Sequence, residues 1–73
     1  MDRGLKAFLA VAQEGSITAA ASKINLTQSS VTKRIATLES EIGVSLFYRD
    51  RRGMSLTEAG QLFLLRAERI KQE

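Results

Sequence analysis

The stretch that decides the fold is SITAAASKINLTQSSVTKRIA, residues 16–36. It predicts two short helices that meet at a tight corner, Asn25–Leu26–Thr27. Asparagine tolerates the left-handed backbone conformation that ends a helix, and the Thr27 hydroxyl can cap the helix that follows. The alanines at 19–21 give the first helix, residues 17–24, a small surface that a second helix can cross closely. The pattern indicates a helix-turn-helix over residues 17–36.

The second helix of this pair begins at Gln28 with polar and basic side chains and carries an apolar stripe behind them. Val31, Ile35 and Leu38 follow at helical spacing, which places them on one face. Residues 15–38 contain no acidic side chain. A polar and basic start of this kind is typical of a recognition helix that enters the major groove of DNA.

Length and composition limit the remaining possibilities. The 73 residues suffice for one small domain with a modest core. The chain has no Cys and no His, and it lacks the Gly-rich phosphate loop and paired acids typical of enzymes. No apolar run reaches transmembrane length, and the N-terminus does not follow the plan of a signal peptide. We therefore expect a cytoplasmic protein with no catalytic residues, no cofactor, no metal and no membrane contact.

The net charge of +3 is concentrated in one part of the chain. Residues 23–52 hold six basic and three acidic side chains, and that difference accounts for the whole excess, because the other residues hold five of each sign. This distribution favours a polyanion such as double-stranded DNA over a solvated surface with scattered charges. A winged-helix module that binds protein is the alternative. Salt-sensitive binding of generic duplex DNA distinguishes the two.

The predicted first helix, residues 2–14, belongs to the core. Its apolar side chains recur on a 3.6-residue period: Leu5, Phe8, Leu9 and Ala12. Asp2 can cap its start, and Gly15 can end it. Ser16 then caps the next helix, and the helix that starts at Gln28 is expected to run to about Glu41, before Gly43.

Residues 44–56 change period and predict a small β-hairpin, or wing. The alternating positions are Val44, Ser45, Leu46, Phe47 and Tyr48. A basic tip follows at residues 49–53, in which Asp50 and Gly53 are turn residues. A wing beside a helix-turn-helix usually contacts the DNA backbone or enters the minor groove.

The wing arginines are candidates for that contact, because arginine is weakly hydrated and a narrow minor groove has an enhanced negative potential. Arg52 is expected in the minor groove and Arg51 at the backbone. Arg49 lies closer to the core and fits a structural role as well as a phosphate contact. The alternative is that these arginines pair with Asp50 and Glu41 on the surface.

Thr57 and Glu58 are predicted to cap a last helix, residues 58–73. Gly60 early in this helix costs about 1 kcal/mol relative to alanine, so we expect a close approach there. The middle turns have almost no polar face, with Leu62, Phe63, Leu64, Leu65, Ala67 and Ile70.

A helix that is apolar nearly all round is buried on more than one side. We expect Phe63 and Ala59 to face the core. Leu62, Leu65 and Ile70 are expected to form the seam of a homodimer. The chain ends without a helix-stop signal, which suggests that it is cut from a longer protein.

The chain resembles the N-terminal DNA-binding domain of LysR-type transcriptional regulators. The first block that carries the resemblance consists of Leu5–Gly15, Ser16–Ala21, Ile24, Leu26–Gln28, Val31, Thr32, Leu38, Glu39 and Gly43. The second consists of Leu46, Phe47, Arg49, Arg52, Leu56, Thr57, Ala59 and Gly60.

The resemblance implies a mainly α, winged helix-turn-helix fold over residues 1–57, with a three-helix core and a β-hairpin wing. It implies a dimerising linker helix over residues 58–73. It also implies a ligand-sensing domain outside this chain, where a small-molecule effector binds. The implied function is sequence-specific binding of double-stranded DNA for transcription regulation, as a dimer on an inverted repeat.

The resemblance implies roles for individual residues as well. Base contacts or contacts to adjoining phosphates fall on Gln28, Ser29, Thr32 and Lys33. Phosphate contacts fall on Thr18 and Thr27, and the minor-groove contact falls on Arg52. The polar and basic start of the recognition helix and the basic wing add further backbone contacts at Ser30, Arg34, Arg49 and Arg51.

The recognition helix departs from the family pattern at three positions. Family members often have proline at position 29, where it touches a thymine methyl group, and Ser29 cannot give that apolar contact. Arg34 stands where glutamine is common and adds a positive charge. Lys33 often appears as arginine, and lysine lacks the bidentate fork that pairs with guanine.

Overall fold

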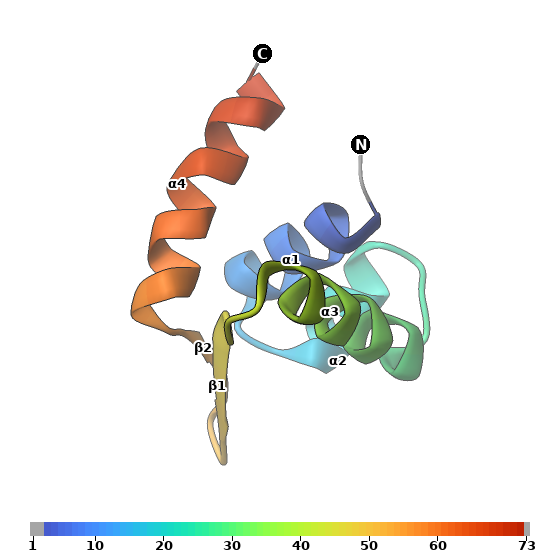
Figure 1. Cartoon of the computed structure of the whole chain (residues 1–73). Coiled ribbons are helices and arrows are strands. Elements are labelled where there is room, and N and C mark those ends of the chain that lie inside the picture. Colours follow the sequence, from blue (N-terminus) through green and yellow to red (C-terminus); the bar gives the residue numbers. More distant parts are fainter. Residues whose placement is uncertain (1–2, 73) are drawn as a thin grey trace.

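The computed structural model describes residues 3–72, with side chains described up to Arg69. The elements in chain order are α1 (Arg3–Glu14), α2 (Ile17–Lys23), α3 (Gln28–Ile42), β1 (Phe47–Asp50), β2 (Gly53–Leu56) and α4 (Glu58–Gln72). Helices α1 to α3 form one body, the β1–β2 hairpin projects from it, and α4 leads away on its own axis (Figure 1). The predicted mainly α, winged helix-turn-helix fold is confirmed. The predicted cap Asp2 and the side chain of Ile70 lie outside the described residues.

Local capping interactions set the helix boundaries. The backbone N–H of Ala19 donates to Ser16 Oγ at 3.1 Å, and that of Ser30 donates to Thr27 Oγ1 at 3.1 Å. The corner residue Asn25 has a φ of 56°, in the left-handed region. The predicted corner and both of these caps are therefore confirmed.

Two helix ends differ slightly from the prediction. Helix α2 ends at Lys23, one residue early, because Ile24 is its C-cap, with a φ of −106° and a ψ of 14° that lie outside the helical region. Helix α3 extends to Ile42, and Gly43 ends it in the left-handed conformation, as predicted.

Phe8 is the centre of the core and joins the elements that flank the helix-turn-helix. Its side chain is fully buried in α1. Its ring centre lies 5.3 Å from that of Phe47 in β1 and 4.9 Å from that of Phe63 in α4, the latter edge-to-face. Such aromatic pairs contribute about 0.5–1.5 kcal/mol beyond area burial. Phe8 therefore ties both the wing and the last helix to α1.

The hairpin begins later than the sequence predicts. Both Leu46 and Phe47 are buried, so the predicted alternation from residue 44 onward is wrong. The cause is that both backbone groups of Leu46 have partners outside a sheet. Its N–H donates to Glu39 Oε2 at 2.7 Å, and its carbonyl accepts from the Thr57 N–H at 3.0 Å. Since Asp50 pairs with Gly53 at the end of the ladder, the tip is residues 51–52 alone.

Backbone atoms anchor the wing to the loop between α1 and α2. The N–H of Met54 donates to the Gly15 carbonyl oxygen at 3.0 Å. A Cβ atom on Gly53 would lie only 2.4 Å from that same oxygen, so no larger residue fits there without a shift. The wing is thus held close to the start of α2.

The first turn of α4 is capped and packed as predicted. The Gly60 N–H donates to Thr57 Oγ1 at 2.9 Å. A Cβ atom on Gly60 would lie 2.1 Å from the Leu46 carbonyl oxygen, which is the close approach expected there. Further along α4, Ala67 is buried against the body while Leu65 is 65% exposed. Within residues 3–72, no helix is both long and apolar enough to cross a lipid bilayer.

Candidate nucleic-acid interface

Helix α3 presents three surfaces around its buried stripe. The side chains that point farthest from the core are exposed, namely Ser29 and Lys33. One flank carries Gln28 and Thr32 and faces α2 and the wing. The other flank carries Ser30 and Arg34 and faces the start of α1. These positions follow from the helical period, because residues four apart lie on one side of a helix.

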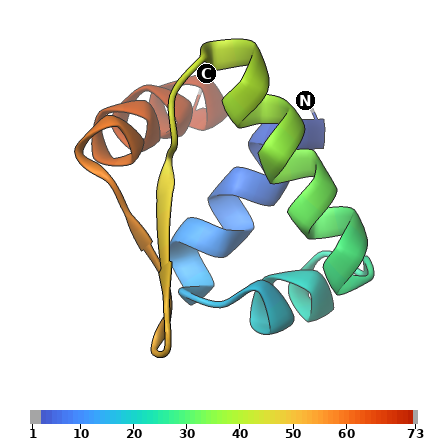
Figure 2. The same cartoon turned by 60° about the horizontal axis from the view of Figure 1, so that its bottom comes forward.

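Four of the predicted contact residues, from three elements, line one concave surface, which we call the wing groove. It has a volume of about 330 Å³. Its lining includes Thr18 at the start of α2, Gln28 and Thr32 on α3, and Arg49 and Asp50 on β1. The wing-tip residues Arg51 and Arg52 are not part of its lining. The hairpin tip projects on the side of the molecule that also holds α2 and the start of α3 (Figure 2). The structure therefore brings these residues together.

The wing arginines are exposed. The Asp50 carboxylate accepts from the backbone N–H of Arg52 at 2.8 Å, so its role is to shape the turn. In residues 3–69, no ion pair joins Arg49, Arg51 or Arg52 to Asp50 or Glu41. The surface pairing considered as an alternative is thus absent from this part of the chain.

Thr27 has a capping role whatever else it contacts. Its oxygen accepts from the Ser30 N–H and lies 3.2 Å from Ser29 Oγ. A hydroxyl that accepts in this way still has its own proton to donate. The geometry therefore allows Thr27 to cap α3 and to donate to a phosphate at the same time.

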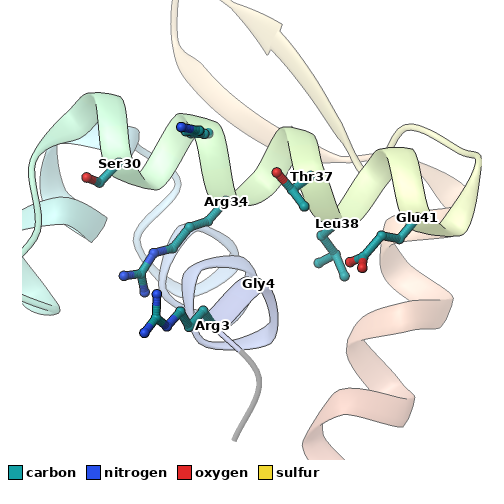
Figure 3. Close-up of a pocket in the computed structure, with 8 residues that line it drawn as sticks. Arg3, Gly4, Ser30, Arg34, Thr37, Leu38 and Glu41 are labelled. Atoms are coloured by element: carbon teal, nitrogen blue, oxygen red, sulfur yellow. The ribbon is translucent and has the colours of Figure 1, made fainter.

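Not every basic residue of the predicted charge excess belongs to this surface. Lys23 Nζ donates to Gln13 Oε1 and forms an ion pair with Glu14 at 3.4 Å. Lys23 thus links α1 to α2, and part of its charge is neutralised there. In contrast, Arg3 in α1 lies beside Arg34, a placement that the sequence analysis missed (Figure 3). No local signal marks it, because the two residues meet only through packing of α1 on α3.

The side chains of residues 3–69 include no group of His, Cys, Asp or Glu arranged to hold a metal ion.

Residues 3–61 match the family model described as "Bacterial regulatory helix-turn-helix protein, lysR family". The chain belongs to the LysR family. The resemblance found in the sequence is therefore confirmed, and the family is one of bacterial transcriptional regulators.

Curated relatives of this LysR-type chain are HTH-type transcriptional regulators. The chain is 50% identical to YofA of Bacillus subtilis over 66 residues, which are 90% of this chain and 23% of YofA. It is 47% identical to ClcR of Pseudomonas putida over 68 residues, which are 93% of this chain and 23% of ClcR. The LysR-type chain thus spans about a quarter of the length of the curated relatives it matches.

Solved structures show the same LysR-type fold. The DNA-binding domain of CbnR, crystallised with DNA, matches with a TM-score of 0.93 and 42% identity, over 99% of this chain and 83% of that one. The DNA-binding domain of BenM, crystallised with benA site 1 DNA, matches with a TM-score of 0.92 and 33% identity, over 99% and 84%. The fold is that of LysR-type DNA-binding domains.

Proposed function

We propose that this LysR-type domain binds double-stranded DNA sequence-specifically, as the DNA-reading part of a transcriptional regulator in the bacterial cytoplasm. Helix α3 enters the major groove and Arg52 enters the minor groove. The observation that carries the proposal is the wing groove, in which the polar start of α3 and Arg49 of the wing share one surface. Within residues 3–69, no wing arginine forms an ion pair. The CbnR and BenM neighbours, both crystallised with DNA, support the same partner.

The outward side of α3 and its wing-facing flank supply the proposed base readout. The residues are Gln28, Ser29, Thr32 and Lys33. The amide of Gln28 can pair with N6 and N7 of adenine, and the exposed first turn of α3 is free to approach a base edge. The proposed backbone contacts are Thr18, Thr27, Ser30, Arg34, Arg49 and Arg51. These contacts fix the register of the domain on the duplex without reading its sequence.

A second copy of the chain is proposed to pair through α4. Leu62 and Leu65 are 56% and 65% exposed in the single chain, which is unusual for large apolar side chains in the same helix. Ile70 is assigned to the same seam. Two-fold pairing covers these side chains and presents two recognition helices to inverted half-sites, about 34–36 Å apart along the DNA.

In this proposal, residues 1–57 form the DNA-reading unit and residues 58–73 form the linker helix. The curated relatives extend well beyond the matched segment, since it covers 23% of YofA. We place any effector-binding site in sequence outside this chain.

A salt titration tests the binding proposal. The affinity of the chain for duplex DNA, measured by fluorescence anisotropy, should fall as salt rises, with a log–log slope of about −0.9 for each phosphate neutralised. A slope of zero overturns the proposal and favours a protein-binding module. The preferred operator is then selected from random duplexes, which also reveals the spacing of half-sites.

Base readout is tested on the selected operator. Gln28→Ala should cost about 1–3 kcal/mol on the operator and little on random DNA. Gln61→Ala is the matched control, because it removes an exposed amide from α4. Equal weakening of operator and random DNA by Gln28→Ala contradicts the assignment of base readout.

A further inference from the structure

A second basic surface lies on the flank of α3 that faces away from the wing. We call it the α1–α3 cleft. It is open to solvent, has a volume of about 480 Å³, and its lining includes Arg3, Ser30, Lys33, Arg34, Thr37 and Glu41. The guanidinium groups of Arg3 and Arg34 reach toward the same part of the cleft, from two different helices (Figure 3).

The helical period explains why α3 lines the cleft with this set. Ser30, Arg34, Thr37 and Glu41 recur at spacings of four, three and four, so they occupy one side of the helix. The buried side chains of α1 and α3 belong to one core cluster, which brings the first turn of α1 against that side. Arg3 thus meets Arg34 although 30 residues separate them in the chain.

The charges in the cleft are unbalanced at the end where the arginines meet. Within residues 3–69, neither Arg3 nor Arg34 forms an ion pair. Glu41, the acidic residue of the lining, lies at the opposite end, beyond Thr37 (Figure 3). Two like charges at close range repel, and an anion between them removes the repulsion. Guanidinium groups match phosphate geometry, because each offers parallel N–H donors.

The position of the cleft identifies the anion. An α-helix with its side chains is about 10–12 Å wide, and the major groove of B-DNA is about 12 Å wide. A helix that enters this groove therefore has a phosphate strand along each of its flanks. The flank with Gln28 and Thr32 lies beside the wing, so the α1–α3 cleft faces the other strand.

We propose that Arg3 and Arg34 together hold one backbone phosphate of the DNA strand on the side of α3 away from the wing. This inference rests on the proposed function and extends the contact surface to α1. Ser30 at the same end of the cleft offers a hydroxyl donor to that phosphate.

The first test measures DNA affinity and its salt dependence for the 73-residue chain and its variants. Arg3→Ala should weaken binding about tenfold on both the selected operator and random DNA, since a phosphate contact carries no sequence information. Its log–log salt slope should be shallower by about 0.9. Lys6→Ala is the matched control, because it removes one positive charge from an exposed position of α1 outside the cleft. It should change affinity by less than about twofold.

The second test locates the phosphate. Single phosphates of the operator are replaced in turn by neutral methylphosphonates. At one phosphate position, on the strand away from the wing, neutralisation of the phosphate should weaken DNA binding by the wild-type chain but not binding by the Arg3→Ala variant. Circular dichroism checks that the variant is folded, and Arg3→Gln serves as a second variant if Arg3→Ala is not.

The results separate the two proposals. The cleft proposal is overturned if no phosphate position depends on Arg3, or if Lys6→Ala lowers the salt slope as much as Arg3→Ala does. If Gln28→Ala still loses operator preference in that case, the proposed function stands without the cleft. A wild-type chain that shows no salt-sensitive DNA binding overturns both.

Discussion

Replacing Gly60 by alanine should loosen the junction between the wing and α4. A Cβ atom at this position would lie 2.1 Å from the Leu46 carbonyl oxygen and 3.0 Å from Leu56 Cδ2. Real Cβ atoms essentially never come closer than 3.0 Å to such an atom, so α4 and Leu46 must separate by about 0.9 Å. The same carbonyl accepts the Thr57 N–H at 3.0 Å, and that bond is strained or lost by such a shift.

The cost can be worked from these contacts. Losing the hydrogen bond lowers the free energy of unfolding by about 1 kcal/mol, and forcing a methyl group into a packed junction lowers it by about 1–3 kcal/mol. The higher helix propensity of alanine raises the free energy of unfolding by about 1 kcal/mol. The net destabilisation is about 2 kcal/mol, which lowers the Tm of a domain of this size by roughly 8–16 °C.

Thermal unfolding followed by circular dichroism measures this effect. Gly43→Ala is the control, because a Cβ atom there meets nothing within 4 Å, although its φ is +84°. The free energy of unfolding of Gly43→Ala should fall only by the cost of holding alanine in the left-handed conformation, about 1–2 kcal/mol. The wing should stay in place. A Gly60→Ala variant at least as stable as the wild-type chain refutes the reasoning, since helix propensity would then outweigh the contact with Leu46.

Three further substitutions test other contacts. Glu39→Ala should lower the free energy of unfolding by about 2 kcal/mol, because the buried N–H of Leu46 loses a charged acceptor, while Glu39→Gln should recover much of this in urea unfolding. Arg52→Ala should weaken binding to operator and random DNA alike in anisotropy titrations, and more so with A·T-rich flanks, where the minor groove is narrow; an effect confined to operator DNA contradicts a groove contact. Leu65→Glu should reduce dimer formation in sedimentation and weaken binding to a full palindrome; unchanged values of both refute pairing through α4.

Features of the fold that depend on neighbours in the sequence could be predicted. Ser16 and Thr27 each accept from an N–H three residues ahead, and Asn25 adopts the left-handed conformation that a helix end requires. Thr57 caps α4 in the same way. These interactions span a single turn, so residue type and spacing are enough to specify them.

Features that depend on tertiary packing could not be predicted. Glu39 has no structural role in the sequence analysis, yet its carboxylate accepts the N–H of Leu46 and so delays the start of β1. Lys23 is counted in the basic excess of residues 23–52, but a tertiary contact pairs it with Glu14. Arg3 received no role, since its neighbour Arg34 comes from a distant part of the chain. In each case the partner is identified only once the helices are packed.

Because of the contact between the wing and Gly15, the position of the wing does not depend on the side chains at its tip. The position of the hairpin depends on main-chain atoms, the Gly15 carbonyl and the Met54 N–H, and on the missing side chain of Gly53. The side chains at positions 51 and 52 take no part in that attachment. A protein engineer can therefore exchange these two residues to change which DNA grooves the wing prefers. The hairpin that carries them keeps its length and direction.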